Sequence, residues 1–193
     1  MARIAFLVDE MFEDTEFQGP YDRVRGAGHE AVIVGLAAGK ELVGKKGKVS
    51  ITTERAAEDM SDDDVDAVVI PGGYSPDHLR TSTAAVGLVR DAFKQGKPVA
   101  AICHAGWMLV EADIADGRTL TSWPSIKTDL LNAGARWVDR EVVEDGNLIT
   151  SRKPDDVPAF CDALLRQVER GVPARAEPAM APEAAAQEPA PGP

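Results

Sequence analysis

Four short, almost wholly apolar segments are spaced along the chain, at residues 4–8, 31–34, 67–70 and 99–102. Continuous apolar runs of this length are typical of strands that are buried on both faces. Between the last two runs, residues 85–93 repeat their apolar positions with the period of a helix. Strands that alternate with helices predict a parallel sheet covered by helices on both faces, which is an α/β fold.

Shorter patterns predict a further strand, a hairpin and a final helix. Residues 48–53 alternate polar and apolar side chains, which predicts a strand inserted at the sheet edge. The pair Asp145-Gly146 separates two apolar runs and predicts a late hairpin. The final helix, residues 157–168, carries one apolar stripe that includes Cys161. We therefore expect Cys161 in the core.

The composition changes near the end of the chain. Residues 172–193 are mostly Ala, Pro and Glu, and Met180 is the only large apolar side chain after Val172. Such a segment cannot bury enough apolar surface to order itself. We expect one folded domain over residues 1–171, followed by a flexible tail over 172–193.

The charge balance bears on possible partners. The 193 residues include 21 Lys and Arg and 32 Asp and Glu, a formal net charge of -11. Such a surface repels phosphate backbones and anionic headgroups, so neither nucleic acid nor membrane is expected as a partner. Two cysteines cannot form a disulfide framework, and the first apolar run is too short for a signal peptide. The expected location is the cytoplasm.

Chemically active side chains follow three of the predicted strands, in the segments 9–14, 71–77 and 103–106. In open α/β sheets, ligands and catalytic groups lie beyond the carboxyl ends of the strands. The three segments are therefore expected to meet at one edge and to form the site. The sequence has no GxGxxG or GxxxxGK[ST] loop and no zinc-type Cys or His spacing, so no cofactor or metal is expected.

Cys103 is the candidate nucleophile. It follows a buried strand and precedes a helix, with Ala101 and Ala105 two positions to either side. Small residues at these positions are typical of a nucleophile elbow, where the turn leaves little room. The positive end of the following helix favours the thiolate, so we expect the pKa of Cys103 to lie below ~8.5. The alternative is a buried structural cysteine.

Four kinds of neighbouring group could complete the site. His104 offers an imidazole, although neighbouring side chains on an elbow diverge, and its backbone N–H can donate to an oxyanion. Gly72 and Gly73 let the backbone approach a ligand and offer a second N–H. Asp77 could orient an imidazole or only stabilise a helix start. Glu13 is the carboxyl expected beside the thiol.

A carboxyl in a semi-buried cleft is pushed toward its protonated form, in which it can donate a hydrogen bond to a thiolate. We expect this of Glu13. The other acids of the same segment, Glu10, Asp14 and Glu16, are expected in solvent. His78 lies near the same sheet edge and is expected on a solvent-facing helix surface.

These motifs together resemble the PfpI family of intracellular cysteine peptidases, within the superfamily of the Parkinsonism-associated deglycase and the class I glutamine amidotransferases. The resemblance covers about residues 1–171. It implies a flavodoxin-like fold, dimers or larger rings, and a site at a subunit interface. It is carried by the segments 12–14 (FED), 71–73 (PGG) with Pro76 and Asp77, 101–104 (AICH), 121–127 (TSWPSIK), 132–134 (NAG), 146–147 (GN) and 150–152 (TSR).

The resemblance also implies roles for single residues. It makes Cys103 the nucleophile, Glu13 the carboxyl that hydrogen-bonds it, and His104 the imidazole partner. The acid at Asp77 would reach His104 from a neighbouring subunit. The implied activity is that of a protease, or of a deglycase or glyoxalase acting on glyoxal, methylglyoxal or their adducts. The substrate is then a small carbonyl compound, a glycated adduct or a peptide.

Two hypotheses from different classes follow. In the first, the protein is a cytoplasmic hydrolase in which Cys103 attacks a carbonyl while the N–H groups of Gly73 and His104 stabilise the oxyanion. In the second, it is a non-catalytic redox sensor or stress-protective binder in which Cys103 is oxidised to sulfenic or sulfinic acid. Flavin or nucleotide binding has little support because the sequence lacks a phosphate loop.

Overall fold

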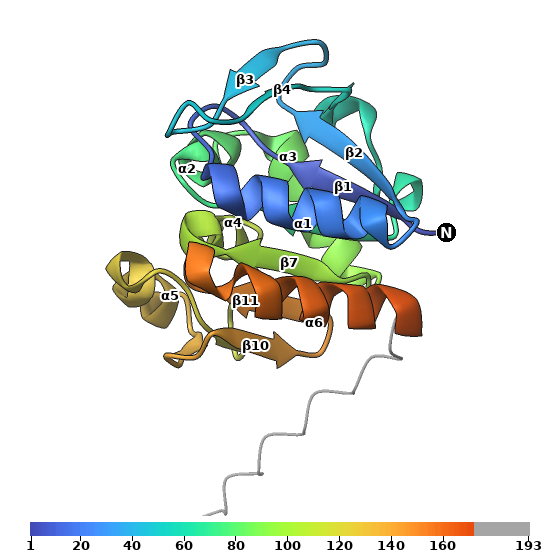
Figure 1. The fold of residues 1–193 in the computed structure, drawn as a ribbon. Coiled ribbons are helices and arrows are strands. Elements are labelled where there is room, and N and C mark those ends of the chain that lie inside the picture. Colours follow the sequence, from blue (N-terminus) through green and yellow to red (C-terminus); the bar gives the residue numbers. More distant parts are fainter. Residues whose placement is uncertain (172–193) are drawn as a thin grey trace, which may run out of the picture.

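A seven-stranded sheet runs through the centre of the molecule (Figure 1). The computed structural model describes residues 1–171. The strands of this sheet are β1 (Arg3–Leu7), β2 (Glu30–Gly35), β5 (Arg55–Ala56), β6 (Ala67–Ile70), β7 (Val99–Ile102), β10 (Val142–Asp145) and β11 (Leu148–Ser151). Their spatial order is β10-β11-β7-β6-β1-β2-β5, and every neighbouring pair is parallel except β10 and β11. The predicted mostly parallel α/β sheet with a late hairpin is confirmed.

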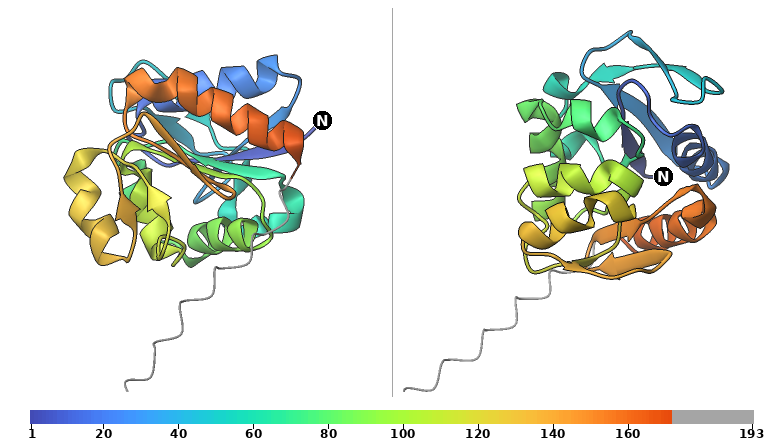
Figure 2. Two further views of the ribbon diagram at one scale, coloured as in Figure 1. Left: turned by 90° about the horizontal axis from the view of Figure 1, so that it is seen from below. Right: turned by 90° about the vertical axis from the view of Figure 1, so that its left-hand side faces the viewer.

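Helices cover both faces of the sheet, as the two views of Figure 2 show. On one face lie α1 (Asp14–Gly26) and α6 (Val157–Arg170), which contact each other. On the other lie α2 (Ser75–Leu79), α3 (Thr83–Lys94) and α4 (Gly106–Glu111), with α5 (Lys127–Asn132) packed against α4. This three-layer arrangement leaves the carboxyl ends of the parallel strands free to build a site.

Successive residues of β1 pack on opposite faces of the sheet. Ile4 and Phe6 belong to the buried cluster that includes α1 and α6, whereas Ala5 and Leu7 belong to the cluster with α3 and α4. The Phe6 ring meets Phe17 of α1 edge to face, with centroids 5.8 Å apart. Burial on both faces explains why the strand is continuously apolar.

The strand expected at residues 48–53 exists as β4 (Ser50–Thr52), but its predicted place at the edge of the main sheet is wrong. It pairs with β3 (Glu41–Val43) in a separate antiparallel sheet, while β5 occupies the edge beside β2. We call residues 41–52 the β3–β4 arm. The Asp14 carboxylate holds the turn of this arm by accepting the backbone N–H groups of Lys46, Lys48 and Val49 at 2.8 to 2.9 Å.

Two further features complete the described chain. β8 (Thr119–Leu120) and β9 (Arg136–Trp137) form a parallel pair of their own. Cys161 of α6 is buried among apolar side chains, as expected from its position on the apolar stripe.

The flexible tail predicted for 172–193 lies outside the described residues. Within residues 1–171, the helices are too short or too polar to span a bilayer.

Candidate active site

Cys103 lies where β7 ends and the chain turns toward α4. Its φ angle is 64°, in the left-handed region that costs a residue with a side chain roughly 1–2 kcal/mol. A short 3-10 turn, Cys103–Ala105, leads into α4. This strand-turn-helix geometry is that of an elbow, and strain of this kind gathers at functional sites. Cys103 is 5% exposed, so only a small part of its surface is open to solvent.

Gly72 and Gly73 pack directly against this turn. A Cβ atom on Gly72 would lie 2.6 Å from Cys103 Cβ and 2.6 Å from Glu16 Oε2, so only glycine fits. Gly73 has a φ of 80°. The backbone N–H groups of Gly73 and His104 act to lower the pKa of Cys103, which favours the thiolate. The two N–H groups expected to face an oxyanion thus affect the titration of the sulfur.

The carboxyl beside the thiol belongs to Glu16 and not to Glu13, which corrects the expectation from the sequence. Glu16 is fully buried, Oε2 accepts the N–H of Gly72 at 3.0 Å, and this oxygen lies on the same side of Gly72 as the Cβ of Cys103. Its second oxygen, Oε1, has no hydrogen-bond partner within residues 1–171. Glu16 was expected in solvent, but it lies one turn before the buried Pro20 on the inner face of α1.

Glu13 is instead held by two lysines of the β3–β4 arm. Lys45 Nζ lies 2.6 Å from Oε2 and Lys46 Nζ lies 2.6 Å from Oε1. Burial acts to raise the pKa of Glu13, but the hydrogen bonds and charges of the two lysines outweigh it and lower the pKa. Glu13 is therefore an ionised carboxylate that bridges the arm to the start of α1.

Burial is the largest influence on the pKa values of Glu16 and Cys103. It raises the pKa of Glu16 to about 8, with the charge of Glu13 adding to the effect, so this carboxyl is protonated at neutral pH. Burial also raises the pKa of Cys103 to about 12, with the charge of ionised Glu16 as the second cause. The expected pKa below ~8.5 is not found, because burial outweighs the backbone N–H donors.

The imidazole of His104 lies between the sulfur and Ser125. Nδ1 is 3.2 Å from Cys103 Sγ, so the neighbouring side chains meet rather than diverge, and Nε2 is 3.0 Å from Ser125 Oγ. Burial lowers the pKa of His104, and the charge of Lys45 lowers it further. A neutral imidazole with its proton on Nε2 can donate to Ser125 and accept the thiol proton on Nδ1. Ser125 was not among the expected site residues, although it lies in one of the segments that carry the family resemblance.

Asp77 makes no hydrogen bond to His104 within the described residues. It lies in α2, where its backbone N–H donates to Tyr74 O at 3.1 Å. The expectation that Asp77 reaches His104 from a neighbouring subunit concerns a second copy of the chain. It stays a prediction.

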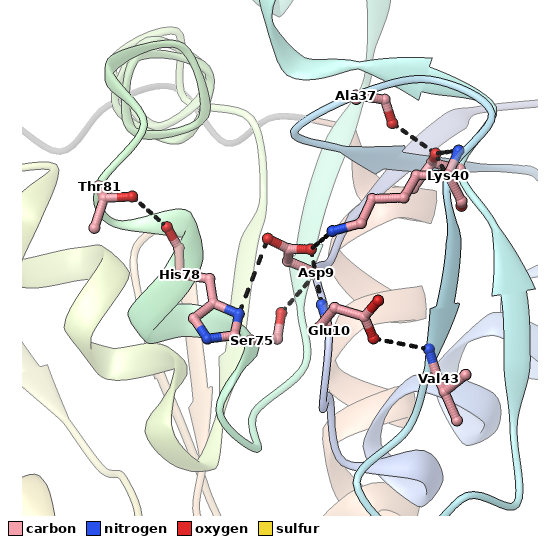
Figure 3. Close-up of polar contacts among 9 residues, drawn as sticks. Asp9, Glu10, Ala37, Lys40, Val43, Ser75, His78 and Thr81 are labelled. Atoms are coloured by element: carbon pink, nitrogen blue, oxygen red, sulfur yellow. Dashed lines mark hydrogen bonds and ion pairs between the residues drawn. The ribbon is translucent and has the colours of Figure 1, made fainter.

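A second polar cluster surrounds Asp9, just beyond the carboxyl end of β1 (Figure 3). Asp9 Oδ1 accepts the N–H of Glu10 at 2.8 Å and faces Lys40 Nζ at 3.2 Å, while Oδ2 lies 4.0 Å from His78 Nδ1. The N–H of Asp9 donates to Ser75 Oγ at 2.8 Å. Asp9 therefore connects Lys40, the residue before the β3–β4 arm, to α2. His78 remains half-exposed on α2, as expected.

Comparisons with known proteins identify the family of the chain. The model of the DJ-1/PfpI family matches residues 2–167. Protein/nucleic acid deglycase 2 of Escherichia coli (strain K12) is 46% identical over 165 residues, which are 85% of this chain and 96% of that protein. General stress protein 18 of Bacillus subtilis (strain 168) is 40% identical over 169 residues, 87% of this chain and 98% of that protein.

A solved structure shares the fold as well. The crystal structure of Drosophila melanogaster DJ-1beta superposes with a TM-score of 0.79 at 32% identity. The match covers 89% of this chain and 90% of that chain. The chain therefore belongs to the DJ-1/PfpI family.

Proposed function

We propose that this protein is a cysteine hydrolase that acts on reactive carbonyl compounds and their adducts through Cys103. The observation that carries the proposal is the surroundings of one sulfur atom, which lies 3.2 Å from Nδ1 of His104 on a strained turn between β7 and α4, with Gly72 and the buried Glu16 carboxyl packed beside it. The name of the deglycase from Escherichia coli supports a carbonyl substrate, and the name general stress protein supports a protective role.

His104 is the base of the first step. Nδ1 accepts the thiol proton across 3.2 Å while the sulfur attacks the carbonyl carbon, so that an S–C bond forms as the π bond of the carbonyl breaks. The proton then passes from the imidazolium to the new alkoxide, which gives a hemithioacetal. With a peptide, the amine leaves with that proton instead, and water hydrolyses the thioester.

A 2-oxoaldehyde can react further without any external oxidant. The hydrogen on the aldehyde carbon of the hemithioacetal moves to the adjacent carbonyl carbon by way of a base. The aldehyde carbon is thereby oxidised to a thioester while the neighbouring carbonyl is reduced to an alcohol. Water then hydrolyses the S–C bond, releases a 2-hydroxy acid and restores the Cys103 thiol.

Glu16 permits a thiolate at Cys103 best in its protonated state. Below a pH of about 8 the carboxyl is protonated, so it carries no charge that opposes a thiolate at Cys103. Once Glu16 is ionised, its negative charge opposes a second negative charge on the sulfur. The rate of attack is therefore expected to fall as the pH rises through about 8.

The test compares Cys103→Ala with Cys161→Ala. Turnover of methylglyoxal, of its adducts with amines and of a peptide panel is measured for both variants and the wild type. Cys161 is buried in α6, so its replacement controls for the loss of a thiol without touching the elbow. We expect only the Cys103 variant to lose turnover, with carbonyl compounds and adducts consumed faster than peptides. Equal rates in the wild type and the Cys103 variant would overturn the proposal.

The same geometry favours the hydrolase over the redox sensor. A sensor cysteine is accessible and is a thiolate at rest. Cys103 is 5% exposed and its pKa is raised by burial, whereas proton transfer to His104 can create a thiolate during a reaction. Intact mass after mild peroxide, with turnover of carbonyl compounds measured in parallel, distinguishes the two functions. A non-catalytic sensor would gain oxygen on Cys103 and would show no turnover that depends on Cys103.

The proposal includes an assembly and a location. We propose a homodimer or larger ring in which Asp77 of one copy orients His104 of another. We further propose that the protein works in the cytoplasm, which is supported by two cysteines that are both free in the structure.

A further inference from the structure

Ser125 lies beside the ring of the proposed base. His104 Nε2 is 3.0 Å from Ser125 Oγ, while Nδ1 on the other side of the ring is 3.2 Å from Cys103 Sγ. The imidazole therefore connects the nucleophile to a hydroxyl of the same chain. The reaction steps proposed above use Nδ1 and give the Nε2 side of the ring no task.

The turn that carries Ser125 is attached to the elbow. It is a 3-10 turn, Pro124–Ile126, that leads into α5. Just before this turn, the N–H of Trp123 donates to Cys103 O at 3.2 Å. At its other end, Ile126 is buried in the apolar cluster that includes residues of α4. The Ser125 hydroxyl is thereby held in place relative to the sulfur.

Two indole rings pack near the imidazole. The ring centroids of Trp107 and Trp123 lie 5.3 Å and 6.4 Å from that of His104. Trp107 Nε1 donates to Asp129 Oδ2 at 2.8 Å, which fixes that indole in turn. Packing against neighbouring rings limits rotation of the imidazole, so Nε2 stays directed at Ser125.

The position of the ring hydrogen decides whether His104 can act as a base. Burial lowers the pKa of His104, so the ring is neutral at neutral pH and has a single N–H. Nδ1 can take the thiol proton only if this hydrogen is on Nε2. The hydrogen bond made by one ring nitrogen sets the protonation of the other. Ser125 Oγ is the acceptor that the Nε2 hydrogen needs.

The same hydrogen bond persists through the proton transfer. When the thiol proton moves from Sγ to Nδ1, the ring becomes an imidazolium and both nitrogens carry hydrogen. Nε2 still donates to Ser125, so no group on that side of the ring has to move. When Nδ1 later gives its proton to the alkoxide, the neutral ring returns with its hydrogen still on Nε2.

We propose that Ser125 is a positioning residue that accepts the Nε2 hydrogen of His104 and thereby keeps Nδ1 open for the proton of the Cys103 thiol. This role rests on the proposed function and deepens it. His104 and Ser125 belong to one chain, so the contact does not need a second copy. Oγ keeps its own hydrogen, which it can donate to Asp77 if another copy supplies that acid.

The experiment compares the wild type with Ser125→Ala, Ser125→Thr and Thr128→Ala. Thr128 is an exposed hydroxyl residue of α5 and serves as the control. Nitrogen NMR of histidine-labelled protein shows which ring nitrogen carries the hydrogen. The chain has three histidines, and the signals of His104 are those that disappear in His104→Asn.

Two rates accompany the spectra. One is the rate at which iodoacetamide alkylates Cys103, where an S–C bond forms as iodide leaves. It requires the thiolate but no turnover. The other is the turnover of carbonyl compounds, analysed as kcat and KM separately, because a residue that orients the base changes kcat and leaves substrate binding intact.

We expect the wild type to carry the hydrogen of His104 on Nε2. In Ser125→Ala the shifts of the two nitrogens should move toward each other. The alkylation rate and kcat should both fall about threefold to tenfold, as loss of one hydrogen bond would cause, with KM unchanged. Ser125→Thr retains the hydroxyl and should restore all three readouts, and Thr128→Ala should match the wild type.

Three results would overturn the inference. They are a wild-type ring hydrogen on Nδ1, rates in Ser125→Ala equal to those of the wild type, and a Ser125→Thr variant as impaired as Ser125→Ala. None of them would affect the hydrolase proposal, which depends on Cys103→Ala. If the wild type turned over no carbonyl compound, the hydrolase proposal would fail, while the nitrogen shifts and alkylation rates would still test the role of Ser125.

Discussion

Replacement of Glu16 by Gln should stabilise the protein, and by more as the pH rises. In the unfolded chain this carboxyl ionises near its ordinary pKa of 4.5, whereas burial raises the pKa to about 8 in the folded protein. Between these values the folded protein keeps a proton that the unfolded chain has lost, so the stability of the wild type falls as the pH rises. Gln has the same shape and does not ionise, and its amide can still accept the N–H of Gly72.

The size of the effect follows from the same two pKa values. The unfolded and folded pKa values of Glu16 differ by about 3.5 units, and each unit is worth ~1.4 kcal/mol of unfolding free energy. Glu16→Gln should therefore raise the unfolding free energy by roughly 3 kcal/mol at pH 7 and by ~5 kcal/mol above pH 8. Urea unfolding of both proteins at a series of pH values between about 5 and 8 measures it. The difference in unfolding free energy should grow by ~1.4 kcal/mol with each pH unit.

Glu13→Gln is the matched control, three residues away in the same segment. The lysine contacts lower the pKa of Glu13, so its contribution to stability is present at neutral pH and is lost as the pH falls through the folded pKa. Glu13→Gln should therefore destabilise the protein at neutral pH, and the deficit should vanish in acid. A difference for Glu16→Gln that does not change with pH, or the same trend in both variants, would refute the reasoning.

Three further predictions concern the turn, the arm and the assembly. Gly72→Ala places a Cβ 2.6 Å from that of Cys103, and should cost about 1–3 kcal/mol in urea unfolding and most of the activity. Asp14→Ala leaves three backbone N–H groups of the arm without their acceptor, and should cost about 2 kcal/mol and speed hydrogen exchange at residues 46–49. Asp77→Asn should lower kcat/KM at least tenfold, and mixing it with Cys103→Ala chains should restore part of the activity if Asp77 reaches His104 of another copy. No restoration, with a single homogeneous oligomer, would place the role of Asp77 within its own chain.

The fold could be predicted because the relevant signals are local. Residues 4–8 and 99–102 are continuously apolar, since each strand is buried between two helical layers, and this pattern needs no knowledge of partners. The strand at 48–53 shows the limit of that reasoning. Alternation revealed a strand, but its pairing with β3 depends on a turn held by Asp14, which lies more than 30 residues earlier in the chain.

The candidate site was harder to predict because it depends on contacts distant in sequence. Glu13 and Glu16 are one helical turn apart, and nothing local distinguishes them. The lysines at 45 and 46 bind Glu13, which leaves Glu16 to face the sulfur. The direction of the Cys103 pKa shift was missed for a related reason, since the helix end is visible in the sequence but the burial that outweighs it comes from packing.

The central claim is that a protonated carboxyl of Glu16 lies against the sulfur of Cys103. The most direct test is the infrared difference spectrum of wild type minus Glu16→Gln, recorded as the pH is raised. We predict the C=O band of a protonated carboxyl at neutral pH, and its conversion to carboxylate bands as the pH passes through about 8. A spectrum that contains only carboxylate bands at pH ~6, above the ordinary carboxyl range, would contradict the account.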